Sequence, residues 1–186
     1  MSTTAAPSTA PATYTIEPIH SSAHFKVRHM MIANVRGEFS KISGTVKFDP
    51  QKLALSGINA EIDVQSISTR EPKRDEHLKS PDFLDAANFP VIKFQSKKVE
   101  ADGPAGYKVT GDLTIRGVTR EVVLFVEGPT PEIKDPWGQI RRGAEALTTI
   151  HRKDYGLAWN QVLETGGWMV GDEVEISLEV ELVRPA

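Results

Sequence analysis

The sequence predicts an all-β protein, an antiparallel arrangement of about eight strands that closes as a sandwich or as a barrel. Two observations carry this prediction. Apolar and polar residues alternate with a period of two along most of the chain, which is the pattern of strands that bury one face. Short turns separate the alternating runs, so successive strands are expected to be neighbours in one meander. Both closures hide one continuous apolar face, and the alternation alone leaves the choice between them open.

The clearest strand lies near the C-terminal end of the sequence. Between Val174 and Leu182, aliphatic residues alternate with polar residues that are almost all glutamates. A helix would scatter these glutamates around its axis, whereas a strand places them on one face. The run 122–126 is apolar throughout, which indicates that its outer face is covered too. Comparable alternation predicts strands in the runs 23–28, 44–48, 58–65, 92–95, 109–116 and 144–151.

The segment 70–84 interrupts the alternation. It is polar, lacks the period of two and is rich in helix formers, so we expect a short helical insertion there. Within it, Ser80–Asp82 combines an N-cap residue with a proline at the first helical position, which predicts a second short turn of helix. The apolar residues that would anchor this insertion to the sheet are Leu78, Phe83 and Leu84.

Two further breaks in the pattern indicate turns. The segment 129–143 contains several prolines and Gly138, and we expect it to be a long loop. Arg116–Arg120 lies between two predicted strands and is typical of a hairpin turn in which Gly117 takes a positive φ.

The length and composition indicate one domain with an N-terminal tail. The domain, residues 13–186, is long enough to bury a substantial core. Residues 1–12 are mainly Ala, Ser, Thr and Pro, and we expect them to be disordered. The tail has neither the basic start nor the apolar stretch of a secretory signal. We therefore expect a cytoplasmic protein, or a periplasmic one if the chain is a processed form.

Charge and cysteine content exclude several classes of protein. The net charge of -3 argues against nucleic-acid binding, which requires a basic face. The chain has 0 cysteines, which excludes disulfides, zinc–thiolate sites, iron–sulfur clusters and cysteine nucleophiles. No stretch approaches the roughly 20 apolar residues that span a bilayer, so we do not expect an integral membrane protein.

Motifs for catalysis or metal binding are weak. Three of the 5 histidines, His20, His24 and His29, lie near the first predicted strand, but no HxH or HExxH pair fixes two ligands at a metal spacing. We expect these histidines at the surface or in turns, with His24 pointing outward because it alternates with Phe25. No GxSxG, P-loop or GxGxxG motif occurs. The sequence therefore predicts no catalytic residue, no metal and no cofactor.

The run 74–79 is the densest concentration of charge. One interpretation is recognition of a ligand headgroup, or acid–base chemistry. The other, which we favour, is a solvated helix face with pairs such as Asp75–Lys79 four residues apart, because a buried charge needs a partner. The residues concerned are Arg74, Asp75, Glu76, His77 and Lys79.

Several stretches become informative when they are taken in order. They are Ile19–His29, Val35–Phe39, Arg74–Phe83, Phe89–Phe94, Gly111–Thr119, Arg152–Leu157 and Val170–Val174. Each is weak alone, but the ordered set is specific. In this order and spacing the chain resembles the YceI-like family of polyisoprenoid-binding proteins, from Tyr14 to Val183.

The resemblance implies a lipocalin-like antiparallel β-barrel of about eight strands with a long hydrophobic pore. It implies an amphiphile inside the pore, typically a polyprenyl or quinone-type lipid, and it makes a homodimer plausible. Members are bacterial proteins, and many carry a secretory signal, from which this sequence departs. Asp75 and His77 match the family motif and would tie the helix to the barrel mouth.

We therefore expect a protein that binds a long-chain isoprenoid or a similar amphiphilic lipid, for carriage, storage or sequestration. The residues expected to line the pore are Phe25, Val27, Phe39, Val46, Phe48, Ile62, Phe94, Leu113, Ile115 and Ile150. Trp159 and Trp168 are candidate mouth residues. Two alternatives stay open: a structural or stress-linked interaction barrel with a filled core, and a hydrolase or isomerase that uses a histidine at the barrel mouth.

Overall fold

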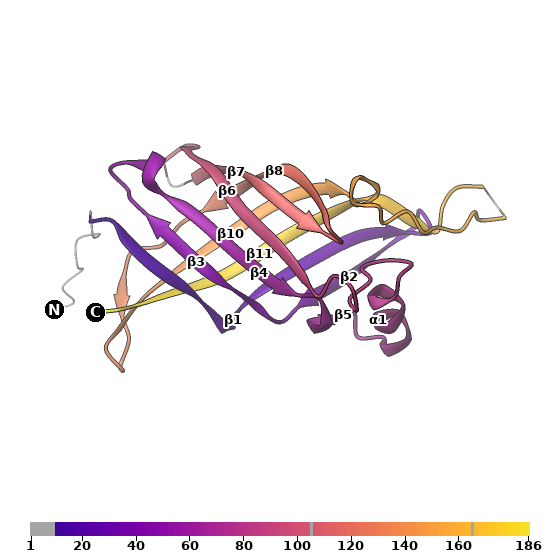
Figure 1. Ribbon diagram of the computed structural model, residues 1–186, viewed down its shortest axis with the longest axis horizontal. Helices are drawn as coiled ribbons and strands as arrows, with labels where there is room; N and C mark the ends of the chain where they lie inside the picture. The colour runs from indigo at the N-terminus through magenta and orange to yellow at the C-terminus, as the bar shows by residue number, and fades with distance from the viewer. Residues whose placement is uncertain (1–9, 105, 165) are drawn as a thin grey trace.

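The structure, a computed structural model, describes residues 10–104, 106–164 and 166–186. These residues form a closed antiparallel β-barrel with one short α-helix (Figure 1). The barrel strands are β1 (Ala12–His29), β3 (Ile42–Phe48), β4 (Gly57–Asp63), β6 (Val91–Ala101), β7 (Gly106–Ile115), β8 (Val118–Glu127), β10 (Gln139–His151) and β11 (Val170–Pro185). Pairing of β1 with β11 closes the wall, so the structure confirms the barrel and not the sandwich.

The long first strand organises the wall. One edge of β1 pairs with β3 near the N-terminus and with β2 (Ala33–Phe39) further along, while its other edge pairs with β11. Between Glu17 and Ser22 the register with β11 shifts, because four residues of β1 face a single residue of β11. Such a bulge bends a strand, and β1 bends at this point.

The insertion is shorter than the sequence predicts. Helix α1 spans Pro72–Lys79, and the Glu71 carboxylate caps it by accepting the Lys73 and Arg74 N–H groups. After α1, Ser80–Asp82 opens a hydrogen-bonded turn and not the expected helical turn. The Ser80 hydroxyl accepts the Asp82 N–H at 3.3 Å, as expected of a capping residue, but it also donates to the His77 carbonyl at 2.7 Å and so closes α1. Phe83 and Leu84 follow in turns and are buried. Strand β5 (Ile67–Ser68) leads into the helix and pairs with β2.

The expected long loop at 129–143 is also wrong in part. Strand β9 (Ile133–Lys134) pairs with β10, which already begins at Gln139. The Asp135 carboxylate accepts the N–H groups of Trp137 and Gln139, at 3.0 and 2.8 Å, and so folds the segment into a tight turn. The predicted hairpin after β7 is present, with Gly117 at φ 73.

The described residues also form three 3-10 turns: η1 (Leu53–Leu55), η2 (Val64–Ser66) and η3 (Arg152–Tyr155). Of the tail predicted at 1–12, residues 1–9 lie outside the described residues, and Ala12 already pairs with Phe48 in the barrel. In the part of the chain that the structure describes, no helix has the length and apolar character needed to cross a membrane.

The buried side chains divide into two clusters. The larger one extends from Phe39 and Phe94 to Leu157, beneath α1 and η3. The smaller one gathers Tyr14, Phe48 and Leu182 with their neighbours at the end where both termini lie (Figure 1). The barrel therefore has two different ends: one carries α1 and the long loop after η3, and the other carries the termini and β9.

Candidate functional site

The inward side chains of the barrel enclose an apolar cavity of about 270 Å³. Its wall draws on every strand of the barrel and on α1, and nearly all of its lining side chains are aliphatic or aromatic. All ten side chains predicted from the sequence lie on this wall: Phe25, Val27, Phe39, Val46, Phe48, Ile62, Phe94, Leu113, Ile115 and Ile150. Their contact with a ligand stays a prediction.

Sequence reasoning missed other residues of the wall. Because the run 122–126 is apolar throughout, the sequence does not show which side chains of β8 point inward. The structure places Leu124 and Val126 on the cavity wall. Phe125 lies opposite Leu147 of β10, and both side chains are exposed on the outer surface. The same period of two would have located further lining residues in strands that were already predicted, including Ile58, Ile92 and Val109.

The barrel is hollow because its large rings lie along the wall. Phe25 packs over Gly37 of the neighbouring strand, where a Cβ would come within 2.3 Å of the ring. Phe94 covers Gly111 in the same way, at 2.6 Å. A side chain at either glycine would push the ring toward the barrel axis. Small lining residues such as Ala60 and Ala146 leave further space.

One buried charge lies on the cavity wall. Arg152, 3% exposed, donates from Nε to the Gly171 carbonyl at 2.8 Å and from Nη1 to the Trp159 carbonyl at 2.9 Å, with further bonds to the carbonyls of Leu157 and Val170. Burial lowers the pKa of this guanidinium, and the nearby Asp172 carboxylate opposes the shift. With its donors directed at the backbone, Arg152 orders the loop at this end of the barrel. Sequence reasoning missed this role, although the residue opens the Arg152–Leu157 stretch.

The charged run of α1 holds the helix in place. The Asp75 carboxylate accepts from the Thr69 N–H at 2.8 Å and from its hydroxyl at 2.5 Å, and so ties the helix to the chain after β5. The expected Asp75–Lys79 pair is wrong, because Lys79 pairs with Glu76 at 3.1 Å. His77 bonds Asp82 at 2.9 Å.

The two candidate mouth tryptophans lie apart. Trp159 packs against His77 and Phe83, with ring centroids 4.8 and 5.2 Å away, and of these three residues only Phe83 is on the cavity wall. A role of Trp159 at the mouth stays a prediction. Trp168 lies further out, in a hairpin beyond β10, and is exposed. His24 bonds the Ser22 hydroxyl at 2.8 Å and faces Glu38 of β2.

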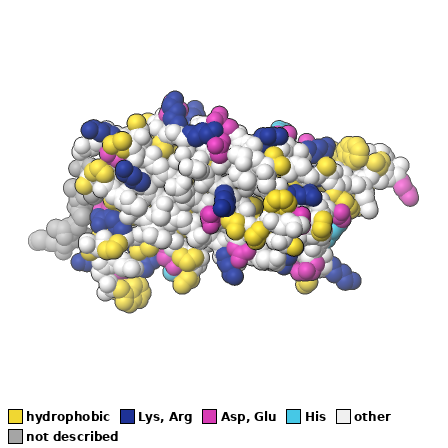
Figure 2. Space-filling model, in the orientation of Figure 1, with side chains coloured by type: hydrophobic (Ala, Val, Ile, Leu, Met, Phe, Trp, Pro, Cys, Tyr) yellow, Lys and Arg dark blue, Asp and Glu magenta, His cyan; other side chains and the backbone are white. Residues whose placement is uncertain are grey.

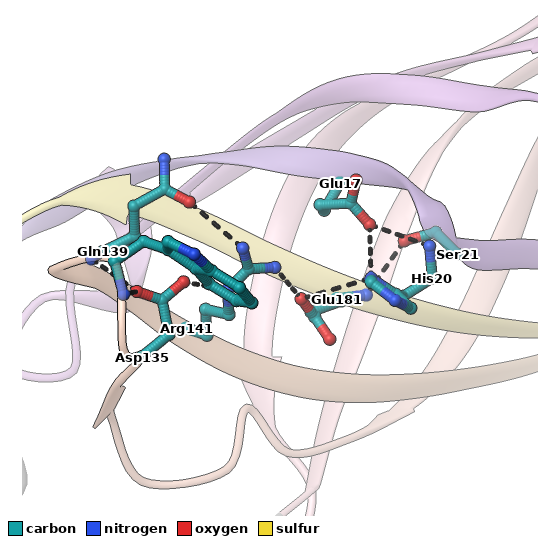
Figure 3. A network of polar contacts seen from close by, with 8 residues as sticks. Glu17, His20, Ser21, Asp135, Gln139, Arg141 and Glu181 are labelled. Atoms are coloured by element: carbon teal, nitrogen blue, oxygen red, sulfur yellow. Dashed lines mark hydrogen bonds and ion pairs between the residues drawn. The ribbon is translucent and has the colours of Figure 1, made fainter.

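A polar network braces the bulge of β1 against β10 and β11 (Figure 3). Glu17 accepts from the backbone N–H and the ring Nδ1 of His20, at 2.8 and 2.9 Å. Partial burial raises the pKa of Glu17, but the hydrogen bonds outweigh it and the net shift is downward. Arg141 bridges Glu181 and Asp135. The ligand-type atoms of Glu17, His20 and Glu181 lie within 4.8 Å of one another. Because His20 contacts both carboxylates and Arg141 binds Glu181, we interpret this cluster as a structural brace.

A second ionic group lies inside the end that carries the termini. Arg142, largely buried, donates to the Thr130 carbonyl at 2.6 Å and lies over the rings of Tyr14 and Phe48. The Tyr14 hydroxyl donates to Glu132 at 2.5 Å, and Arg184 donates to the same carboxylate. Partial burial alone would raise the pKa of Glu132. The hydrogen bonds from Tyr14 and Arg184 lower it by more, so the net shift of the pKa is downward.

Comparison with known proteins agrees with this architecture. The chain is 36% identical over 168 residues to a UPF0312 protein of Staphylococcus aureus strain N315, covering 90% of this chain and 95% of that one. The crystal structure of Burkholderia cenocepacia BcnA superposes with a TM-score of 0.75 at 25% identity, covering 89% and 98% of the two chains.

A polyisoprenoid binding domain from Saccharophagus degradans shares the fold, with a TM-score of 0.63 at 16% identity over 92% of this chain and 98% of that one. The profile of the YceI-like domain matches residues 14–182, which is the barrel from β1 to β11. The chain therefore belongs to the YceI-like family.

Proposed function

We propose that this protein binds a long-chain isoprenoid or a similar amphiphilic lipid inside the barrel, for carriage, storage or sequestration. The cavity supports this proposal most directly, because it is apolar and extends through both clusters of buried side chains. An apolar cavity of about 150 Å³ in another protein stays dry and binds benzene. The larger cavity of about 270 Å³ here is better suited to a slender chain.

The energetics favour an apolar chain over water. Water inside such a wall forms few hydrogen bonds, and each buried CH₂ group of a ligand contributes about 0.8 kcal/mol. A long chain would therefore bind without a charged contact. A binding domain with the same fold, from Saccharophagus degradans, is described as polyisoprenoid-binding, which supports the choice of isoprenoids as the first ligands to test.

The two alternatives receive less support. The filled-core barrel conflicts with the hollow interior. The hydrolase or isomerase would need a histidine pair, or a histidine and a carboxylate, facing each other inside the cavity. Among the described residues, His24 is in the lining, but Glu38, the carboxylate that it faces, is not. Both members of the His77–Asp82 pair lie outside the lining. A binding role without catalysis is therefore our proposal. The expected homodimer stays a prediction, which light scattering tests.

The experiment is lipid extraction from the purified protein followed by mass spectrometry. We expect a bound lipid in the wild type and a strong loss in Ile115→Trp, because the indole fills the cavity without adding a charge. Lys93→Trp is the matched control, since Lys93 is exposed on the outer face next to Phe94. It should keep the lipid.

Circular dichroism must show that both variants fold. If the wild type carries no lipid and takes up neither a prenyl lipid nor a fatty acid, the proposal is wrong. Equal loss in the two variants would also contradict it, because the effect would then not come from the cavity.

A further inference from the structure

A hairpin projects from the α1 end of the barrel, at the right of Figure 1. This hairpin arm comprises residues 160–164 and 166–169. The Met169 N–H donates to the Gln161 carbonyl at 2.9 Å, and Val162 forms a bridge with Trp168. Cross-strand partners share one face of a hairpin, and both of these side chains are exposed, by 70% and 53%.

The base of the arm is fixed to the cavity wall. Asn160 pairs with the backbone of Val170, donating to its carbonyl at 2.7 Å and accepting its N–H at 3.0 Å. Arg152 binds the carbonyls of Trp159 and Val170 on the two sides of the same base. Since Arg152 and Val170 also line the cavity, the base of the arm is continuous with the cavity wall.

A second apolar turn lies against the arm. The Met30 N–H at the end of β1 donates to the Met169 carbonyl at 2.8 Å, and Met31 approaches Gly167. Met31 and Ile32 are 57% and 77% exposed. Met30 and Met31 have φ values of 49 and 63, in the left-handed region that costs non-glycine residues energy. Met30, Met31, Ile32, Val162 and Trp168 together form what we call the apolar tip, and Figure 2 shows hydrophobic side chains gathered at this end.

The geometry points to the apolar tip as the surface that docks this protein on a lipid bilayer, next to the α1 end of the cavity. Exposed apolar side chains gathered in one place mark an interaction surface. The tip consists of side chains on two narrow projecting turns, whereas a stable protein interface needs about 800 Å² of matched surface on each partner. Tryptophan is enriched where a bilayer meets water.

Charge complementarity favours the same partner. Arg28 donates from Nε to the Met31 carbonyl at 3.2 Å, which holds an exposed guanidinium directly behind the apolar turn. This places a cation at the level of lipid phosphates when the turn enters the interface. The exposed Glu164 at the far end of the arm favours shallow contact along the headgroups over deep insertion.

The route for a ligand would be short. Val27 and Val170 are cavity-lining residues within three positions of the tip. A bilayer bound at the tip would therefore lie beside the α1 end of the barrel. This reasoning rests on the proposed lipid-binding function, although docking itself is measured separately.

The experiment is co-flotation of the full chain with phosphatidylcholine vesicles, with and without added phosphatidylglycerol. We expect wild type to float and Trp168→Asp or Ile32→Asp to lose roughly tenfold or more in affinity, as expected for one large side chain left in water. Trp137→Asp is the matched control, because Trp137 is an 82% exposed tryptophan at the opposite end of the barrel. It should float as wild type does. Arg28→Gln should lose about fivefold, and only on the anionic vesicles.

Tryptophan emission gives an independent reading. The vesicle-induced blue shift should persist in Trp137→Phe and disappear in Trp168→Phe. Absence of flotation by wild type, equal losses in Trp137→Asp and Trp168→Asp, or a tip that instead holds two copies of the chain together would overturn docking. A protein that carries lipid but ignores vesicles refutes docking alone. A protein that binds vesicles through the tip yet takes up no lipid supports docking and refutes the proposed function.

Discussion

The two ends of the barrel each bury an arginine, and they hold it differently. Arg142, near the start of β10, lies in an ionic group with Tyr14, Glu132 and Arg184, in which the Glu132 carboxylate offsets the positive charge. Arg152, just after the same strand, meets backbone carbonyls instead. The first arrangement joins the N-terminal strand to β10 and β11. The second shapes one long loop and through it the hairpin arm.

Each end also buries a tyrosine, and again the surroundings differ. Tyr14 and Tyr155 are both 1% exposed. The Tyr14 hydroxyl donates to a carboxylate, whereas the Tyr155 hydroxyl has no hydrogen-bond partner among the described residues. Burial raises the pKa of Tyr155 to about 12, with Asp154 adding to the shift and Arg120 opposing it. The end with the termini therefore satisfies its buried tyrosine, whereas the α1 end buries a hydroxyl without a partner, which carries a local cost in free energy.

The largest expected effect is at Arg152. Arg152→Met should lower the free energy of unfolding by about 3–5 kcal/mol, because the substitution leaves several buried carbonyls without donors. Urea denaturation measures the change, and Lys153→Met, at the exposed neighbouring position, is the control with an expected change near zero. A loss no larger than that of the control would mean that Arg152 does not order the loop.

A smaller loss is expected at the other end. Tyr14→Phe removes a hydrogen bond to the Glu132 carboxylate and should lower the free energy of unfolding by about 2 kcal/mol, within the range for bonds to charged groups. Tyr107→Phe is the comparison, because Tyr107 keeps its ring contact with Phe48 after the substitution. If Tyr14→Phe costs no more than Tyr107→Phe, the ionic group does not stabilise this end.

The sequence predicts the barrel wall better than it predicts the loops. The alternation located the strands and placed side chains such as Phe94 and Ile115 on the inner face, because side-chain direction follows from a period of two. Closure depends on pairing between β1 and β11, which lie far apart in the chain, and only the family resemblance chose the barrel. Whether Phe25 fills the centre depends on Gly37 of the next strand, which no single run of sequence shows.

The loops were less predictable because one polar side chain can serve several backbone groups. Ser80 was expected to start a helical turn, but it starts a non-helical one and its hydroxyl also donates to the last turn of α1. Asp135 turns the proline-containing segment into a hairpin. Arg152 sits in a charged stretch that suggests the surface, yet the carbonyls of a loop 5 to 19 residues away satisfy it in the interior. In each case the partner is a backbone atom, which carries no sequence signal.

The pH dependence of stability should distinguish the ionic end. The pKa of Glu132 lies below its ordinary value of 4.5 in the folded protein, so the native state binds this proton more weakly than the unfolded chain does. The resulting stabilisation is present above pH 4.5 and is lost as the pH falls through the lowered folded pKa. Urea denaturation at several acidic pH values should show a steeper loss in wild type than in Glu132→Gln. Parallel curves for the two proteins would contradict this account.

The smallest expected effect has the opposite sign and lies at Tyr155. A buried hydroxyl without a partner costs free energy in the folded state, and phenylalanine keeps the ring while it removes that group. Tyr155→Phe should therefore raise the free energy of unfolding by about 1 kcal/mol, where the same substitution at Tyr14 lowers it. Ultraviolet titration gives a second reading, because the tyrosine that ionises near pH 12 should vanish from the variant. A variant that is less stable than wild type would show that the hydroxyl has a hydrogen-bond partner in solution, such as an enclosed water. Both ends of the barrel would then satisfy the hydroxyl of their buried tyrosine.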